Sequence, residues 1–290
     1  MVEFCTRGVD TGFVALGYTK VAVLGVVQGI TELLPISSTA HMRLVPAVLG
    51  WQDPGSAFSA AMQLAALAAV VSYFWSDVRG LAANSLRAIA SGQLRNRDLR
   101  FSLWIILATI PIGIAGLLLA KLLNTCNSPL RTISVIGWAC VVMALLLGIA
   151  EVRARHRRNI NDASFVDAIL VGIAQAGALI PGVSRSGSTL TAALALGFKR
   201  DEAARLSFLL GLPAIALAGL KEMWELYKIH LDVHGWSVLL LGLIVASISA
   251  FLAIWGLMRV LEQFSTWPFV VYRFLLGVVI LAGAAAGWLG

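Results

Sequence analysis

The chain has 290 residues, of which 59% are hydrophobic and 13% are charged, and its formal net charge is +7. Its mean hydropathy of +0.86 excludes a soluble domain of this length and indicates an integral membrane protein. The apolar runs have the length of membrane helices, roughly 18–25 residues, and do not alternate as barrel strands do. We therefore expect a single all-α membrane domain over residues 1–290.

The positive charge invites a nucleic-acid interpretation, which we reject. The basic residues lie in short loops between apolar runs, where they set the orientation of membrane helices. Cys5, Cys126 and Cys140 show no metal-site spacing, and Cys140 is expected to pack inside an apolar run. The expected partners are therefore membrane lipids, and not nucleic acid; the oligomeric state stays open, a homodimer included.

The first apolar segment in chain order, residues 15–49, is interrupted near its centre by Pro35. Its halves are too short to cross a hydrocarbon core of about 30 Å, which takes about 20 helical residues. We expect a re-entrant pair of helices that enters the membrane and returns. Irregular backbone at that depth has to be surrounded by protein or by a water-filled cavity.

Uninterrupted spans are expected over 56–75, 101–120, 131–150, 202–222, 237–258 and 268–288. A second broken segment, 165–199, lies between the third and fourth of these spans. Its Pro181 follows Pro35 by 146 positions, close to half of the 290 residues. The chain is therefore predicted to hold two repeats, approximately 13–150 and 163–290, each with one re-entrant pair and three spans.

The distribution of basic residues predicts how the repeats are oriented. Two loops separated by two spans are rich in arginine, namely Arg79, Arg87, Arg95, Arg97 and Arg100 in one, and Arg153, Arg155, Arg157 and Arg158 in the other. The positive-inside rule places both loops in the cytoplasm. The first repeat then begins outside and the second inside, so the repeats are inverted. The two broken segments enter from opposite sides, and such matched breaks commonly mark a binding site near the membrane midplane.

Three ionisable residues, Glu32, His41 and Arg185, lie in otherwise apolar surroundings. A charge at membrane depth costs about 2.5–3.5 kcal/mol on insertion scales, so such residues usually face a cavity, a partner or a ligand. The plainer alternative is that the three only pair with one another and brace the fold. The hydroxyls and glycines around them favour a ligand.

Arg185 lies in the stretch 181–189, where a break leads into a new helix. The amides at a helix start favour an anion, and glycine lets the backbone approach it closely. Further donors surround the arginine, namely Ser184, Ser186, Ser188 and Thr189, with Gly182 and Gly187 beside them. This combination is typical of a phosphate site. A P-loop is excluded by the missing lysine, and a lipid-type acid phosphatase would need histidine where Thr191 stands.

The stretch around the first break carries complementary chemistry. Gln28 and Glu32 are four residues apart, which places them on one helical face. One carboxylate, together with substrate phosphate oxygens, is enough to bind Mg²⁺, or it can act as a base. Ser37, Ser38 and Thr39 follow the break, and His41 comes shortly after them. Serines in such a place usually cap a helix, but a hydroxyl with an acid or base in reach is also the arrangement for phosphoryl transfer.

Both stretches resemble motifs of the undecaprenyl-diphosphate phosphatase family, which is also known for bacitracin resistance. The first motif is matched by Gln28, Glu32, Pro35, Ser37, Ser38 and His41, and the second by Pro181, Gly182, Ser184, Arg185, Ser186 and Thr189. The resemblance covers nearly the whole chain. Two positions depart from it: Gln28 stands where many members carry an acid, and Ala40 stands where glycine is common.

The resemblance implies a hydrolase dependent on Mg²⁺ or Ca²⁺ that removes one phosphate from undecaprenyl diphosphate and so recycles the lipid carrier of cell-wall synthesis. It implies a bacterial inner-membrane protein whose site opens to the periplasmic side. Ser38 is expected to attack with His41 as acid or base, and the reverse assignment, with His41 as nucleophile, stays open. Glu32 and Gln28 are expected to position the metal or activate the nucleophile.

The remaining motif residues are expected to line the substrate site, namely Ser37, Thr39, Gly182, Ser184, Ser186 and Thr189, with Arg185 holding the phosphate charge. The alternative function is a transporter or flippase for a polyprenyl phosphate or another anion. Inverted repeats with broken helices are typical of alternating access.

Overall fold

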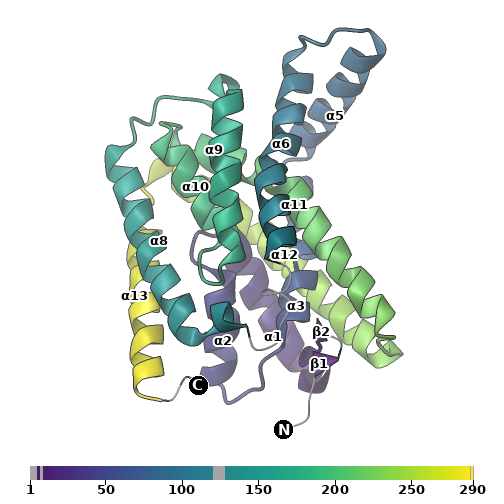
Figure 1. The fold of residues 1–290 in the computed structure, drawn as a ribbon, viewed down its shortest axis with the longest axis vertical. Coiled ribbons are helices and arrows are strands. Elements are labelled where there is room, and N and C mark those ends of the chain that lie inside the picture. Colours follow the sequence, from purple (N-terminus) through teal and green to yellow (C-terminus); the bar gives the residue numbers. More distant parts are fainter. Residues whose placement is uncertain (1–4, 7–8, 120–127, 288, 290) are drawn as a thin grey trace.

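The computed structural model describes residues 5–6, 9–119, 128–287 and 289 (Figure 1). Nearly all regular structure in these residues is helical, apart from the short antiparallel strands β1 (Cys5–Thr6) and β2 (Val9–Asp10). Seven helices of the described chain are long and apolar enough to cross a membrane. The sequence-based prediction of an all-α, multi-pass membrane protein is confirmed at this level.

Six of the seven correspond to the predicted uninterrupted spans. They are α3 and α4 taken together (Ser56–Ala61 and Gln63–Tyr73), α6 (Arg97–Leu118), α8 (Ile133–Arg153), α11 (Arg200–Lys228), α12 (Val233–Gln263) and α13 (Trp267–Ala285). The helices α11 and α12 exceed the predicted lengths, because their polar ends continue the helix beyond the apolar window. The connection between the predicted spans 101–120 and 131–150 lies mostly outside the described residues.

Both predicted breaks are present. The first separates α1 (Phe13–Leu33) from α2 (Ser38–Val48), and the second separates α9 (Phe165–Ala176), with its one-turn extension η3 (Gly177–Leu179), from α10 (Arg185–Ala195). Each second helix is capped by a serine in a left-handed conformation: Ser37 has φ 73° and Ser184 has φ 64°. Each serine hydroxyl accepts a backbone N–H three residues on, from Ala40 and Gly187. The two breaks therefore use the same capping chemistry.

Two details of the prediction are corrected. The first half of segment 15–49 is longer than predicted, because α1 has 21 residues and counts among the seven helices long and apolar enough to cross a membrane, with Gly17 (φ 71°) interrupting it near its start. Residues 76–100 are not only a loop, because α5 (Trp75–Ala90) occupies much of them. A hydropathy window misses α5, since its buried face is small and packs on α6 through Ser85.

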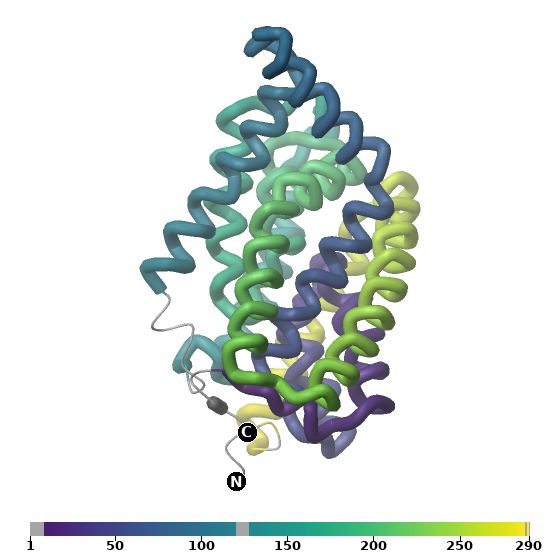
Figure 2. The backbone as a smooth tube through the Cα atoms, turned by 90° about the vertical axis from the view of Figure 1, so that its right-hand side faces the viewer, coloured from purple at the N-terminus to yellow at the C-terminus, as the bar shows by residue number. Residues whose placement is uncertain are grey.

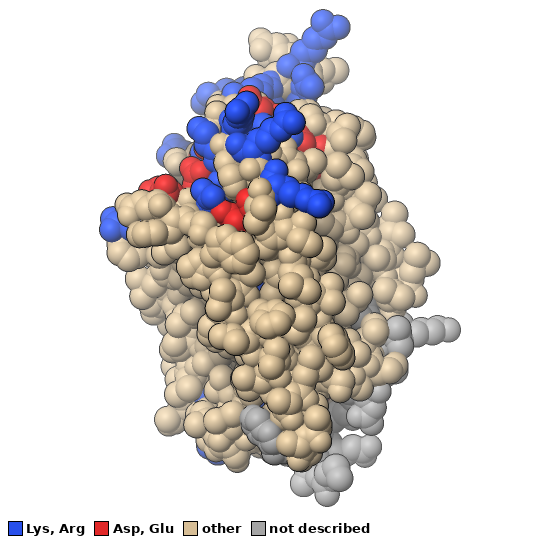
Figure 3. Space-filling view, turned by 90° about the vertical axis from the view of Figure 1, so that its left-hand side faces the viewer, with Lys and Arg blue, Asp and Glu red and all other residues tan. Residues whose placement is uncertain are grey.

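The two broken segments lie at opposite ends of the helical bundle (Figures 1 and 2). In these views α1 and α2 occupy the lower half and α9 and α10 the upper half, while α5 and the start of α6 rise above the bundle. The packing crosses between the halves of the chain: α1 packs along α12, α9 packs along α6, and α8 packs against α13. Lys and Arg side chains gather at the upper end (Figure 3).

Apolar side chains fill the space between these helices in two main clusters. One surrounds α10 and includes Leu194, Phe198 and Leu206, which are all fully buried. The other lies where α1, α3 and α12 meet and includes Phe13 and Phe58. The first break is enclosed by protein, since Pro35, Ile36 and Ser37 are all buried, as irregular backbone at membrane depth requires.

Glycines bring the broken segments into close contact with their neighbours. A Cβ atom on Gly25 would lie 3.0 Å from the carbonyl oxygen of Gly242, and one on Gly29 would lie 2.4 Å from that of Ala246, both on α12. In the second half, a Cβ on Gly172 would lie 2.6 Å from the carbonyl oxygen of Ala108 on α6. The GxxxG spacing of Gly25 and Gly29 therefore serves close helix packing inside the protein.

Replacing Gly29 by leucine should destabilise the protein by about 1–3 kcal/mol, because the side chain has to push α1 away from α12. Thermal unfolding of the detergent-solubilised chain measures this as a lower midpoint. Gly113→Leu on α6 is the matched control, since nothing lies within 4 Å of a Cβ there. Equal midpoints for the two variants would contradict the close packing.

Candidate active site

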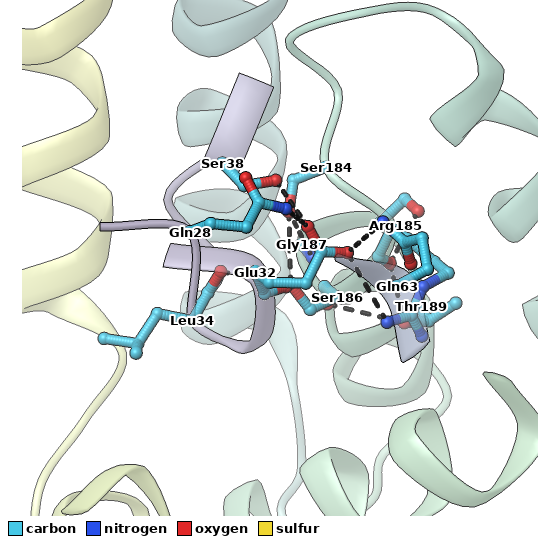
Figure 4. A network of polar contacts seen from close by, with 11 residues as sticks. Gln28, Glu32, Leu34, Ser38, Gln63, Ser184, Arg185, Ser186, Gly187 and Thr189 are labelled. Carbon is cyan, nitrogen blue, oxygen red and sulfur yellow. Dashed lines mark hydrogen bonds and ion pairs between the residues drawn. The ribbon is translucent and has the colours of Figure 1, made fainter. Parts of the chain in front are cut away.

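The carboxylate of Glu32 lies at the end of α1 and is held by three side chains (Figure 4). Its Oε2 accepts hydrogen bonds from the Nε2 of Gln28 at 2.9 Å and from the hydroxyl of Ser38 at 2.6 Å. Its Oε1 accepts from the Nε2 of Gln63, on α4, at 2.9 Å. Only 6% of Glu32 is exposed. The first repeat therefore fixes a buried carboxylate directly against a serine hydroxyl.

Arg185 brings a positive charge to the same point from the second half of the chain. It is the first residue of α10, and its guanidinium nitrogen lies 3.9 Å from Oε1 of Glu32. Its side chain is 9% exposed, yet none of its three guanidinium nitrogens has a hydrogen-bond partner among the described residues. A buried guanidinium is stable only when acceptors surround it, so Arg185 is arranged to bind an anion.

Two glutamines near the breaks supply buried acceptors. Gln28 and Gln175 each precede a capping serine, Ser37 or Ser184, by nine residues. Each is 1% exposed, and within the described chain the Oε1 atom of each has no donor. Buried polar atoms without partners are rare and commonly mark a ligand or ion site. The sequence analysis named Gln28 but did not single out Gln175 as a site residue.

One hydroxyl of the second motif, that of Ser186, links the two breaks, and the hydroxyls of Ser184 and Thr189 form hydrogen bonds within α10. Ser186 donates to the backbone carbonyls of Glu32 at 3.1 Å and Leu34 at 3.0 Å. Thr189 donates to the carbonyl of Arg185 at 2.8 Å, and Ser184 caps α10. These three residues lie beside the carboxylate and the arginine, as predicted. Their contact with substrate stays a prediction.

His41 is not in contact with Ser38 in the described structure. Its Nδ1 lies 2.7 Å from the carbonyl of Ser37, and its Nε2 lies 2.7 Å from the hydroxyl of Tyr272, whose ring stacks on it. A carbonyl can only accept, so Nδ1 carries a proton; in the neutral form of the ring, Nε2 then accepts from the hydroxyl of Tyr272. The Ser38 hydroxyl donates a hydrogen bond to Glu32 instead. Thr39 is an exposed residue of α2.

Arg273 is a central residue that the sequence analysis missed. It lies in α13, is fully buried, and donates to the carbonyl of Pro35 at 3.3 Å and to that of Gly182 at 2.7 Å. It also donates to the carbonyl of Val183. One guanidinium thereby satisfies backbone groups of both breaks. An arginine inside the apolar span 268–288 was the available signal, because such a charge rarely occurs without a function.

Comparison with known proteins identifies the family. Residues 21–279 match the bacitracin resistance protein BacA family. The chain belongs to this family. It is 74% identical over 262 residues to undecaprenyl-diphosphatase 2 of Mesorhizobium japonicum, which covers 90% of this chain and 99% of that protein. It is 47% identical over 282 residues to the undecaprenyl-diphosphatase of Trichormus variabilis, covering 97% of this chain and 88% of that protein.

The resemblance to the BacA family implies a divalent cation, and the residues at the break fit one. No group of three or more His, Cys, Asp or Glu side chains that could hold a metal occurs among the described residues. Mg²⁺, however, usually takes one or two carboxylates and completes its shell with water and substrate phosphate oxygens. Glu32 would supply the carboxylate, and the Oε1 of Gln28, which has no donor among the described residues, would supply a further oxygen of the type that Mg²⁺ and Ca²⁺ prefer.

Replacing Arg273 by methionine should lower the rate at which this BacA-family protein hydrolyses undecaprenyl diphosphate at least a hundredfold. The carbonyls at both breaks would lose their shared donor, each at a cost of about 1–3 kcal/mol, and the breaks would lose their relative position. Initial rates of phosphate release measure the effect. The control is Arg259→Met, which removes an exposed arginine from α12. Similar rates in both variants would contradict the bridging role.

Proposed function

We propose that this chain is a phosphatase that hydrolyses undecaprenyl diphosphate to undecaprenyl phosphate and inorganic phosphate. The names of its relatives, at up to 74% identity over almost the whole chain, support this activity. The observation that carries the proposal is the meeting of Ser38 and Glu32, from one half, with the buried guanidinium of Arg185, from the other. Nucleophile, base and phosphate-binding charge then occupy one place.

In the proposed reaction, Arg185 binds the terminal phosphate and stabilises the charge on its oxygens in the transition state. The Ser38 hydroxyl attacks phosphorus and gives its proton to Glu32, whose Oε2 is 2.6 Å away. The bond from phosphorus to the bridging oxygen breaks, and undecaprenyl phosphate leaves. Water then attacks the phosphorus of the phosphoserine, the bond from phosphorus to Ser38 Oγ breaks as inorganic phosphate is released, and Glu32 returns its proton to Oγ. A cation held by Glu32 and Gln28 would neutralise phosphate charge.

The rival assignment makes His41 the nucleophile. Its Nε2 faces Tyr272, so attack would first require that hydrogen bond to break. Trapping the phosphorylated protein separates the two assignments, because a phosphoserine survives acid and a phosphohistidine does not. The geometry favours Ser38, whose hydroxyl already contacts a carboxylate.

The isoprenoid tail is proposed to lie in an apolar groove of about 640 Å³ between α1 and α12. The groove is lined almost entirely by aliphatic side chains and begins beside Leu34, whose carbonyl accepts from Ser186 at the break. A tail in this groove would end beside the first break, and its diphosphate would pass around the end of α1 to reach Glu32, which lies on the opposite helical face from Val26 and Ile30. Burying each methylene group of such a tail contributes about 0.8 kcal/mol.

The repeats are proposed to be inverted, in the inner membrane of a bacterium, with the site open to the periplasmic side. Three observations support this: the exchange of packing partners between the halves, the matched capping serines, and the gathering of basic residues at one end (Figure 3). The positive-inside rule makes the basic end cytoplasmic. Then α1 and α2 enter from the opposite, periplasmic side (Figure 1).

Purified protein should release phosphate from undecaprenyl diphosphate in the presence of Mg²⁺, and a chelator should abolish the release. Ser38→Ala and Arg185→Ala should each lower the rate by about three orders of magnitude, equivalent to roughly 4 kcal/mol of transition-state stabilisation. Thermal unfolding of each variant checks that it is folded.

The same assay tests the transporter alternative. Well-folded wild-type protein that releases no phosphate would contradict the phosphatase proposal, and lipid flipping in liposomes would then be the activity to measure. Arg185→Ala with near wild-type turnover would contradict the role given to that arginine.

Filling the groove should separate tail binding from chemistry. Gly256 lines the groove, and nothing lies within 4 Å of a Cβ there, so Gly256→Trp should fold normally. We expect KM for undecaprenyl diphosphate to rise about tenfold, since losing the burial of two methylene groups costs about 1.6 kcal/mol. Turnover of a short-chain isoprenyl diphosphate should change little. Gly113→Trp on α6 is the control, and equal KM values would place the tail elsewhere.

A further inference from the structure

A polar cavity separate from the candidate active site lies at the basic end of the molecule. It has a volume of about 520 Å³ and is enclosed by α5, the start of α6, the turn η2 (Ile160–Asp162) and α11. None of its lining residues contacts Glu32 or Arg185 through a hydrogen bond or ion pair in the described structure. The proposed phosphatase reaction does not use it.

The cavity is strongly basic. Four arginines and two aspartates line it, namely Arg95, Arg97, Arg100, Arg205, Asp77 and Asp98, which gives a formal charge of +2. Both carboxylates already have partners: Asp77 accepts two hydrogen bonds from Arg205, and Asp98 accepts one from Asn84 at 2.6 Å. The other three arginines form no ion pair with a described carboxylate.

Several of these side chains are fixed in place. Arg205 is held by Asp77, Arg97 donates to the side-chain oxygen of Asn161, and the guanidinium of Arg100 lies 5.3 Å from the ring centroid of Trp104. Orientation in the membrane requires only positive charge near the helix ends. It does not explain arginines from α6 and α11 arranged around one cavity.

The floor of the cavity is apolar and includes the buried side chains of Phe101 and Leu209. Guanidinium groups and apolar side chains that line one cavity match a phosphate group carried on an apolar stem. Guanidinium groups bind phosphate oxygens in pairs, which gives both affinity and orientation. A neutral or cationic ligand would leave the positive charge of these arginines uncompensated.

We infer that this cavity binds a phosphate-bearing anion at the basic face of the protein. The ligand is either the phosphate head of a membrane lipid or inorganic phosphate itself, since both offer the same acceptor oxygens. In the proposed orientation the cavity lies at the headgroup level of the inner leaflet, where anionic lipids are concentrated. The inference does not depend on the catalytic proposal.

The test measures binding by the full-length protein in two arms. In one arm, inorganic phosphate is titrated into detergent-solubilised protein and followed by calorimetry. In the other, the protein is placed in lipid nanodiscs with phosphatidylglycerol or with phosphatidylcholine alone, and ³¹P NMR detects immobilised headgroups. Phosphate binding in the first arm identifies the free ion as ligand; immobilisation of phosphatidylglycerol alone identifies a lipid.

The variant is Arg95→Gln combined with Arg100→Gln, and the matched control is Arg79→Gln combined with Arg87→Gln. All four arginines are exposed, but only the first pair lines the cavity, and both doubles remove the same charge. We expect the first double to weaken binding at least tenfold and the control to weaken it less than twofold. An equal loss in both doubles, or no binding in either arm, overturns the inference.

The active site also attracts phosphate, so the doubles are measured in the wild-type protein and in Arg185→Ala. The cavity should still bind phosphate in the Arg185→Ala variant. This binding should be lost when Arg95 and Arg100 are replaced as well. If Arg185→Ala does not fold, the wild-type background still decides, because the first double should remove one of two classes of site. Hydrolysis rates are recorded separately, so failure of the phosphatase proposal would not mimic failure here.

Discussion

The structure depends on satisfying backbone carbonyls where two helices break at membrane depth. Lipid offers no donors, so each freed carbonyl needs a partner from the protein. Arg273 supplies donors to Pro35 in the first break and to Gly182 in the second, and Ser186 of the second repeat supplies one to Leu34 of the first. The first break is therefore not satisfied by its own half of the chain, because Arg273 and Ser186 both belong to the second half. The two breaks therefore have to lie side by side.

That adjacency accounts for the chemistry of the site. Gln28, Ser37 and Ser38 each precede Gln175, Ser184 and Arg185, respectively, by 147 positions. The first helical residue after the break is therefore a serine in one half of the chain and an arginine in the other. The starts of α2 and α10 also meet there, and the partial positive charge of helix N-termini favours an anion. Two matching breaks thus bring two different side chains, a serine and an arginine, to one point.

The sequence was sufficient to predict six of the seven candidate spans, both breaks and the residue types around them, because each is a local signal. Hydropathy located the long helices, and proline located the breaks. The helix α5 was missed because it is polar enough to look like a loop.

Other features depended on contacts between residues far apart in the chain. Arg273 is 238 positions from Pro35, and Tyr272 is 231 positions from His41. Nothing in a local window indicates that His41 would face Tyr272 while Ser38 faces Glu32. The role of Gln63 in holding Glu32 was hidden for the same reason, since its signal is a contact and not a motif.

The most direct test of a single site built by both repeats is a double-mutant cycle between Glu32→Gln and Arg185→Gln, measured as kcat/KM for undecaprenyl diphosphate. Residues that act together in one transition state are strongly non-additive. The account predicts that the double variant is hardly slower than the slower single variant, with a coupling energy above about 1 kcal/mol. Single effects that multiply fully in the double variant would show that the two residues act independently, and would contradict a shared site.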